Sequence, residues 1–214
     1  MAMALRVVVP PHPLLSHWLT VLRDRQTPQP LYATAMAELG RWLTYEAMRD
    51  WLPRRQVEIS TPTGPSSGEV VDPAVPLLAV VGLRAGLGLW QGGQTVLPAA
   101  LVGHLSADAD GLINAALPDP LPQGCGVVLF WGELAEPEPV LQVLNNLAER
   151  GISGPRLRLI TALAAAPALH AIGERHGELT LHCAAIDPDL DDQGAISPGI
   201  GMIETRLFGF QQAR

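Results

Sequence analysis

The sequence predicts an α/β protein built on a doubly wound parallel sheet, on two observations. From residue 77 onward, short apolar runs alternate with stretches of helical period. The apolar runs are continuous, as strands covered by helices on both faces require. The expected strands are residues 77–81, 99–102, 127–130, 157–161 and 179–183, and the expected helices between them are 84–91, 140–150 and 168–174.

Two amphipathic helices are expected before the sheet, within residues 1–53. The first covers residues 14–23, where apolar side chains recur at helical spacing. The second covers residues 31–51 and ends near Pro53. We expect these helices to pack on each other or on the sheet.

Residues 61–76 are rich in proline, glycine and serine, which predicts a flexible loop or hairpin. A loop of this kind does not have to separate two domains. At 214 residues the chain is long enough for one substantial core and short for two. We therefore expect residues 1–214 to form a single domain.

Composition excludes several classes of function. A net charge of -7 and the absence of any run of Lys or Arg argue against nucleic-acid binding. The apolar stretches are too short for a membrane span and no signal peptide is evident, which favours a cytoplasmic protein. Cys125 and Cys183 accompany apolar runs and are expected to be buried free thiols. His12 and His17 have the wrong spacing for a metal site, so we expect none.

The stretch from Phe130 to Pro139 lies where a phosphate-binding loop is expected, between a strand and a helix. Pro137 and Pro139 remove two backbone donors from that position. The glutamates at 133, 136 and 138 add negative charge there, which opposes an anionic ligand. Trp131 has three open interpretations: a core residue, a side chain filling the pocket, or part of a docking surface.

Several segments between His12 and Gly209 together resemble the uracil phosphoribosyltransferase family. They include the opening His12-Pro13-Leu14, a turn at Leu83-Arg84-Ala85-Gly86, and tail motifs in residues 184–187, 196–201 and 206–209. The resemblance implies a type I phosphoribosyltransferase fold with a C-terminal hood at residues 186–210, and a homodimer. It also implies transfer of ribosyl phosphate from phosphoribosyl pyrophosphate, with magnesium, to uracil. Arg84 would bind pyrophosphate, and Ile196 and Gly201 would bind the base.

The chain departs from the family pattern on the phosphate side. A second family arginine falls on Ala109, and the family's Asp-Pro-Met-Leu-Ala-Thr-Gly-Gly-Ser falls on residues 131–139. Only Leu134 and Ala135 are kept there, and a family aspartate of the tail is lost within residues 201–205. The altered loop positions are Trp131, Glu136, Pro137, Glu138 and Pro139.

These losses predict a catalytically inactive homologue with no catalytic residue and no cofactor. Such a protein would sense uracil or a nucleotide, or bind a protein partner as a regulatory or assembly subunit. The alternatives are an active uracil phosphoribosyltransferase that uses magnesium and makes UMP, and a purely structural subunit without a small-molecule ligand.

Four aspartates between residues 187 and 192 are expected to form a solvated turn rather than a calcium site. His104 and His182 end apolar runs and are expected to be core residues without a catalytic role.

Overall fold

The computed structural model describes residues 4–107 and 113–209, and its centre is a seven-stranded sheet of order β1-β9-β8-β7-β4-β5-β6. Neighbouring strands are parallel, except that β6 runs antiparallel to β5. The strands are β1 Arg6–Val8, β4 Leu77–Gly82, β5 Leu101–Ala107, β6 Ile113–Ala116, β7 Gly126–Leu134, β8 Leu157–Ala165 and β9 Thr180–Asp187. The predicted α/β class is confirmed.

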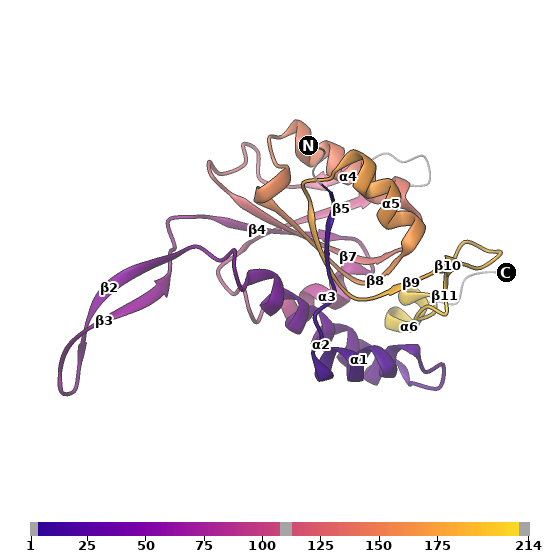
Figure 1. Cartoon of the computed structure of the whole chain (residues 1–214), viewed down its shortest axis with the longest axis horizontal. Helices are drawn as coiled ribbons and strands as arrows, with labels where there is room; N and C mark the ends of the chain where they lie inside the picture. The colour runs from indigo at the N-terminus through magenta and orange to yellow at the C-terminus, as the bar shows by residue number, and fades with distance from the viewer. Residues whose placement is uncertain (1–3, 108–112, 210–214) are drawn as a thin grey trace.

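Helices cover both faces of the sheet (Figure 1). One face carries α1 Pro13–Arg23, α2 Gln29–Met48, α3 Gly86–Gly93 and α6 Ile203–Phe208, and the other carries α4 Pro137–Glu149 and α5 Ala166–Arg175. Each face has its own apolar cluster, and all nine residues of β8 are buried between them. A strand with no exposed face is mostly apolar, as β8 is apart from Arg158 and Thr161. The continuous runs therefore identified the central strands β4, β7, β8 and β9.

The two predicted N-terminal helices are present, and they pack on each other and on the sheet. α1 begins after His12, whose Nδ1 accepts the Leu14 N–H at 3.2 Å. α2 approaches α3 so closely that a Cβ added to Gly92 would lie 1.7 Å from the Ala37 carbonyl oxygen. The predicted second helix was displaced by two to three residues, because α2 spans Gln29–Met48.

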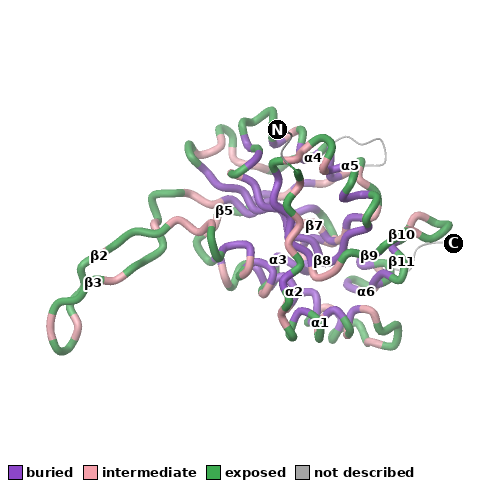
Figure 2. The backbone as a smooth tube through the Cα atoms, viewed as in Figure 1, coloured by how far each residue is buried: buried purple, intermediate pink, exposed green. Residues whose placement is uncertain are grey.

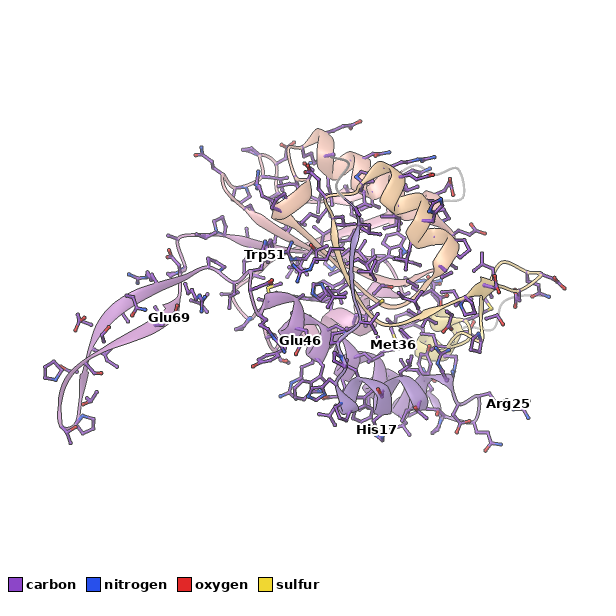
Figure 3. All side chains as sticks on the ribbon, viewed as in Figure 1. His17, Arg25, Met36, Glu46, Trp51 and Glu69 are labelled. Carbon is purple, nitrogen blue, oxygen red and sulfur yellow. The ribbon has the colours of Figure 1, made fainter. Side chains whose placement is uncertain are left out.

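The hairpin predicted within residues 61–76 is longer and begins earlier. β2 Arg54–Thr61 and β3 Gly64–Val71 form a two-stranded arm that projects from the body of the molecule (Figure 1). Its residues are almost all exposed (Figure 2). β2 was missed because Val57 and Ile59 are its only apolar residues, too few to give an apolar run. Figure 3 places Glu69 on the arm, where it pairs with Arg54 at 3.3 Å.

Trp51 lies at the root of the arm and ties it to the body (Figure 3). Its indole N–H donates to the Pro155 carbonyl at 2.8 Å. The short 3₁₀ helix η1 Gly154–Arg156 holds that acceptor, just before β8.

Two further expectations concern membrane-spanning helices and the two cysteines. None of the described helices is both long and apolar enough to cross a membrane. Cys125 and Cys183 are buried free thiols, as predicted. Burial raises the pKa of Cys183 to about 12, so this thiol is unreactive at neutral pH.

Candidate functional site

The candidate site lies beyond the carboxyl ends of β4 and β7, the edge where open α/β sheets bind ligands. The turn after β4 carries Arg84 and leads into α3. Gly86, at the start of α3, lets the helix meet β7, because a Cβ there would lie 2.4 Å from the Phe130 carbonyl oxygen. The start of α3 and strand β7, which flank the site, are therefore in close backbone contact.

The connection between β7 and α4 is much shorter than predicted. β7 does not end at Phe130 but continues to Leu134, and Glu133 and Leu134 pair with Leu163 and Ala164 of β8. α4 begins at Pro137, which leaves only residues 135–136 between strand and helix. The expected nine-residue loop is therefore wrong. Pro137 starts the helix early, because proline is pre-organised for the first helical position.

This β7–α4 corner offers few groups to an anion. Pro137 and Pro139 occupy the first and third positions of α4, so of these three positions only Glu138 has a backbone N–H. Glu136, at the N-cap, makes no capping hydrogen bond. The glutamates at 136 and 138 are exposed, and Glu138 in the first turn already complements the positive helix end.

A cavity of about 150 Å³ lies between the β4–α3 turn, the end of β7 and α6. Trp131 is half-buried and forms one wall, and its ring lies so close to Gly82 that an added Cβ would be 2.5 Å from Cε3. The same side chain packs against the apolar cluster under α4 and α5. Trp131 is thus both a core residue and a cavity wall. The lining residues are Gly82, Leu83, Ala85, Trp131, Gly132, Glu133 and Glu204.

Arg84 forms an ion pair with Glu204 of α6, with 2.5 Å between Nη2 and Oε2. Both side chains are about half exposed. Sequence reasoning missed this partner, since 120 positions separate the two residues and no periodic pattern links them. The guanidinium that the resemblance assigns to pyrophosphate thus contacts a carboxylate.

Glu133 is a half-buried acid that lines the cavity. Burial raises the pKa of its carboxyl from an ordinary 4.5 to about 7. The charge also acts on Tyr32 of α2, where burial is the main reason that the pKa of the phenol is raised. Sequence reasoning treated Glu133 only as one negative charge of a loop, whereas it belongs to a strand and faces a cavity.

The tail, residues 186–209, is held by two charged anchors. In the first, Arg23 of α1 donates two hydrogen bonds to the Asp187 carboxylate, at 2.6 and 2.8 Å, and a third to the Gly199 carbonyl at 3.0 Å. Asp187 also accepts the Gly199 N–H at 2.9 Å. The hydrogen bond from Arg23 lowers the pKa of Asp187 more than burial raises it. The predicted solvated turn is therefore wrong for Asp187, which is buried and paired.

In the second anchor, Arg206 of α6 lies over the Tyr32 ring, 4.1 Å from its centroid. It donates to three backbone carbonyls, those of Leu22, Asp24 and Ile200. The Tyr32 hydroxyl donates to Ile200 as well, at 3.2 Å. Around these contacts the tail includes the two-stranded pairing of β10 Asp189–Leu190 with β11 Ile196–Ser197.

The predicted base-binding residues belong to this anchored tail and do not line the cavity. Ile196 is buried in the core. Gly201 is exposed, with φ at +70°, a conformation that favours glycine. The β7–α4 corner lies beside the tail hairpin, because a Cβ added to Gly194 would be 3.5 Å from a Glu136 carboxylate oxygen. Ala109 falls outside the described residues.

The residues around the cavity do not fit a magnesium ion. No group of three or more His, Cys, Asp or Glu side chains in residues 4–107 and 113–209 is arranged to hold a metal. Glu204 is engaged by Arg84, and Glu133 is protonated in about half of the molecules near pH 7. His182 is buried, and burial lowers its pKa to about 4, which suits a core histidine.

Comparison with known proteins places this geometry in a family. The sequence model described as uracil phosphoribosyltransferase matches residues 9–210. The chain belongs to this family. The protein named uracil phosphoribosyltransferase from Synechococcus elongatus is 44% identical, over 98% of this chain and 99% of its own. One of the same name from Nostoc is 41% identical, over 98% of this chain and 100% of its own.

A plant relative and a solved structure extend the match. The chloroplastic uracil phosphoribosyltransferase of Arabidopsis thaliana is 43% identical, over 95% of this chain and 71% of its own length. The solved structure of the AQ2163 protein from Aquifex aeolicus is 27% identical, covers 97% of this chain and all of that one, and has a TM-score of 0.84. The family membership that the motifs indicated is thus confirmed along nearly the whole chain.

Proposed function

We propose that this chain is a uracil phosphoribosyltransferase homologue that binds a base-like ligand and does not transfer ribosyl phosphate. The observation that carries the proposal is the two-residue β7–α4 corner, with prolines at the first and third positions of α4. Phosphoryl and pyrophosphoryl groups bind where backbone N–H groups converge at a helix start. Here prolines and exposed glutamates occupy that start.

The size of the rate loss expected for each missing hydrogen-bond donor supports the loss of turnover. Removing one preorganised donor to developing negative charge typically lowers a rate by about two to three orders of magnitude. In this chain two donors are absent from one helix start, and the Arg84 guanidinium contacts Glu204. Such losses are not additive, but together they remove the charge stabilisation on which a pyrophosphate leaving group depends.

The deciding experiment measures UMP from uracil, phosphoribosyl pyrophosphate and magnesium, together with calorimetric titration of phosphoribosyl pyrophosphate. The proposal expects neither turnover nor a binding heat. A matched variant replaces residues 131–139 with the family pattern Asp-Pro-Met-Leu-Ala-Thr-Gly-Gly-Ser. That variant should gain phosphoribosyl pyrophosphate binding, because it restores the glycines, the hydroxyls and the N–H donors. Binding by the unaltered chain would overturn the proposal.

An active uracil phosphoribosyltransferase is the second candidate, and the comparisons favour it. Relatives that are 41–44% identical over nearly the whole chain are named for that enzyme, and none of the comparisons points to inactivity. Arg84 and the anchored tail are also kept. UMP formation that disappears in Arg84→Ala would establish this function in place of the first.

The binding role itself divides into sensing and assembly. A rise in melting temperature with uracil or UMP supports a sensor, because a ligand selective for the folded state must stabilise it. Its absence supports an assembly subunit. We further propose a homodimer, since Ile59, Val70 and Val71 expose apolar surface on the hairpin arm. Light scattering at micromolar concentration tests this, and a monomer mass would refute it.

A further inference from the structure

The cavity between Arg84, Trp131 and α6 has the dimensions and walls of a ring-binding pocket. Its volume is about 150 Å³, which is enough for one benzene-sized ring. Trp131 offers an aromatic wall, and Leu83 and Ala85 an aliphatic one. The cavity is partly open to solvent and has room for a single planar six-membered ring.

The cavity contains two carboxyl groups in different situations. Glu204 is engaged by Arg84 at 2.5 Å. The Glu133 side chain is half-buried, and none of the described residues donates a hydrogen bond to its carboxyl or forms an ion pair with it. A ligand that replaces the water at a partly desolvated carboxyl with directed hydrogen bonds is stabilised there. Glu133 is therefore the polar group that a ligand in this cavity would contact.

We propose that this cavity binds a small planar nitrogen heterocycle in which an amino group stands beside a ring nitrogen. Such an amidine edge presents one donor and one acceptor side by side. A protonated Glu133 donates its O–H to the ring nitrogen and accepts the amino N–H through its second oxygen. If the proton moves to the ring, both hydrogen bonds remain, now between a carboxylate and an amidinium, and they are stronger for being charged.

The titration of Glu133 fits this exchange. Its carboxyl pKa of about 7 makes both protonation states available at neutral pH. A protonated Glu133 can also pair with uracil, through the uracil carbonyl oxygen and ring N–H. Uracil has no basic ring nitrogen to take the proton, so this pair stays neutral and is the weaker of the two.

This inference goes beyond the proposed function and can fail separately from it. Ile196 and Gly201 do not line the cavity. A base held by the tail and a ring held beside Glu133 are thus separate questions. If no UMP forms in the enzyme assay, the proposal for the cavity still stands. If no heterocycle binds in the cavity, the proposal that the β7–α4 corner does not bind phosphate still stands.

The test is calorimetric titration of the full chain at pH 7 with 2-aminopyridine, pyridine and uracil. We expect saturable binding of 2-aminopyridine, with pyridine at least about tenfold weaker because it lacks the amino donor. Uracil should compete more weakly than 2-aminopyridine itself, because it pairs only with the protonated carboxyl. These three ligands examine the amidine edge on the unaltered protein, without any mutation.

Two glutamate substitutions then locate the site. Glu133→Leu, which removes both polar atoms of the carboxyl, should weaken 2-aminopyridine binding by about tenfold to a hundredfold, since both hydrogen bonds are lost. Glu138→Leu makes the same change at an exposed position outside the cavity and should leave binding unchanged. Circular dichroism confirms that both variants are folded. The proposal is overturned if 2-aminopyridine does not bind, if pyridine binds equally well, or if Glu133→Leu binds as the unaltered protein does.

Discussion

The tail and the β7–α4 corner lie side by side, yet they are built from opposite kinds of interaction. The tail is fastened by specific, mutually satisfied charges, Arg23 with Asp187 and Arg206 with three carbonyls. The corner carries exposed glutamates and prolines that leave few donors. The difference teaches that the tail is fixed by contacts with the helices of the scaffold. The corner depends on a two-residue connection between β7 and α4.

The largest expected effect comes from breaking the tail anchor with Arg23→Ala. Asp187 would be left buried without its ion-pair partner, with only the Gly199 N–H as a donor, so we expect a loss of about 3 kcal/mol in the free energy of unfolding at pH 7. Because the pKa of Asp187 is lowered, this contribution is present above the ordinary carboxyl pKa and is lost as pH falls through the lowered value. Urea denaturation at neutral and strongly acidic pH measures both.

The matched control for that anchor is Arg49→Ala. Arg49 pairs with Glu46 at the same 2.6 Å, but its side chain is 69% exposed. Its loss should change stability by less than about 0.5 kcal/mol. Equal effects at Arg23 and Arg49 would show that the tail is not fastened by its charges.

The second prediction concerns Glu133 and pH. A carboxyl whose folded pKa rises from 4.5 to about 7 destabilises the folded state as pH increases through that window, by up to about 3 kcal/mol. Glu133→Gln should remove this decline, because glutamine does not ionise. The raised pKa of Glu133 would be contradicted if the free energy of unfolding changed with pH in the same way for the two proteins between pH 4.5 and about 7.

The third prediction tests the packing of the cavity wall. Gly82→Ala places a Cβ 2.5 Å from the Trp131 ring, so the ring must move, and we expect a loss of about 1 to 3 kcal/mol. Gly68→Ala on the hairpin arm is the control, since its nearest atom would be 3.7 Å away. Thermal melts of both variants give the comparison. A neutral Gly82→Ala would mean that Trp131 is not held against β4.

The smallest expected effect concerns the start of α4. Glu138 lies in the first turn, so Glu138→Gln should lower stability by about 0.3 to 1 kcal/mol at low ionic strength. Glu149, the last residue of α4, lies at the negative end of the helix, so Glu149→Gln should raise stability slightly. Denaturant curves that show the same sign for both would exclude a helix-dipole effect at this corner.

The fold was predictable because its strands are buried on both faces and therefore continuously apolar. The extension of β7 through Glu133 was not predictable. It depends on backbone pairing with β8, which the local sequence around Glu133 does not reveal. The arm strand β2 has only two apolar residues, Val57 and Ile59, and β1 is only three residues long.

The site was less predictable than the fold. The composition of the corner indicated correctly that prolines replace donors there, because that loss is local. The pairs Arg23 with Asp187 and Arg84 with Glu204 join residues 164 and 120 positions apart. No spacing rule connects such residues, so only the folded chain shows which charges meet.

The projecting arm and the central sheet should differ in the rate of amide hydrogen exchange. β2 and β3 form only a two-stranded ribbon with both faces exposed, and a ribbon of this kind is marginally stable alone. Its amide protons should exchange through local opening, while those of β8 wait for opening of the whole sheet. Slow exchange in the arm would therefore report directly that another molecule covers it.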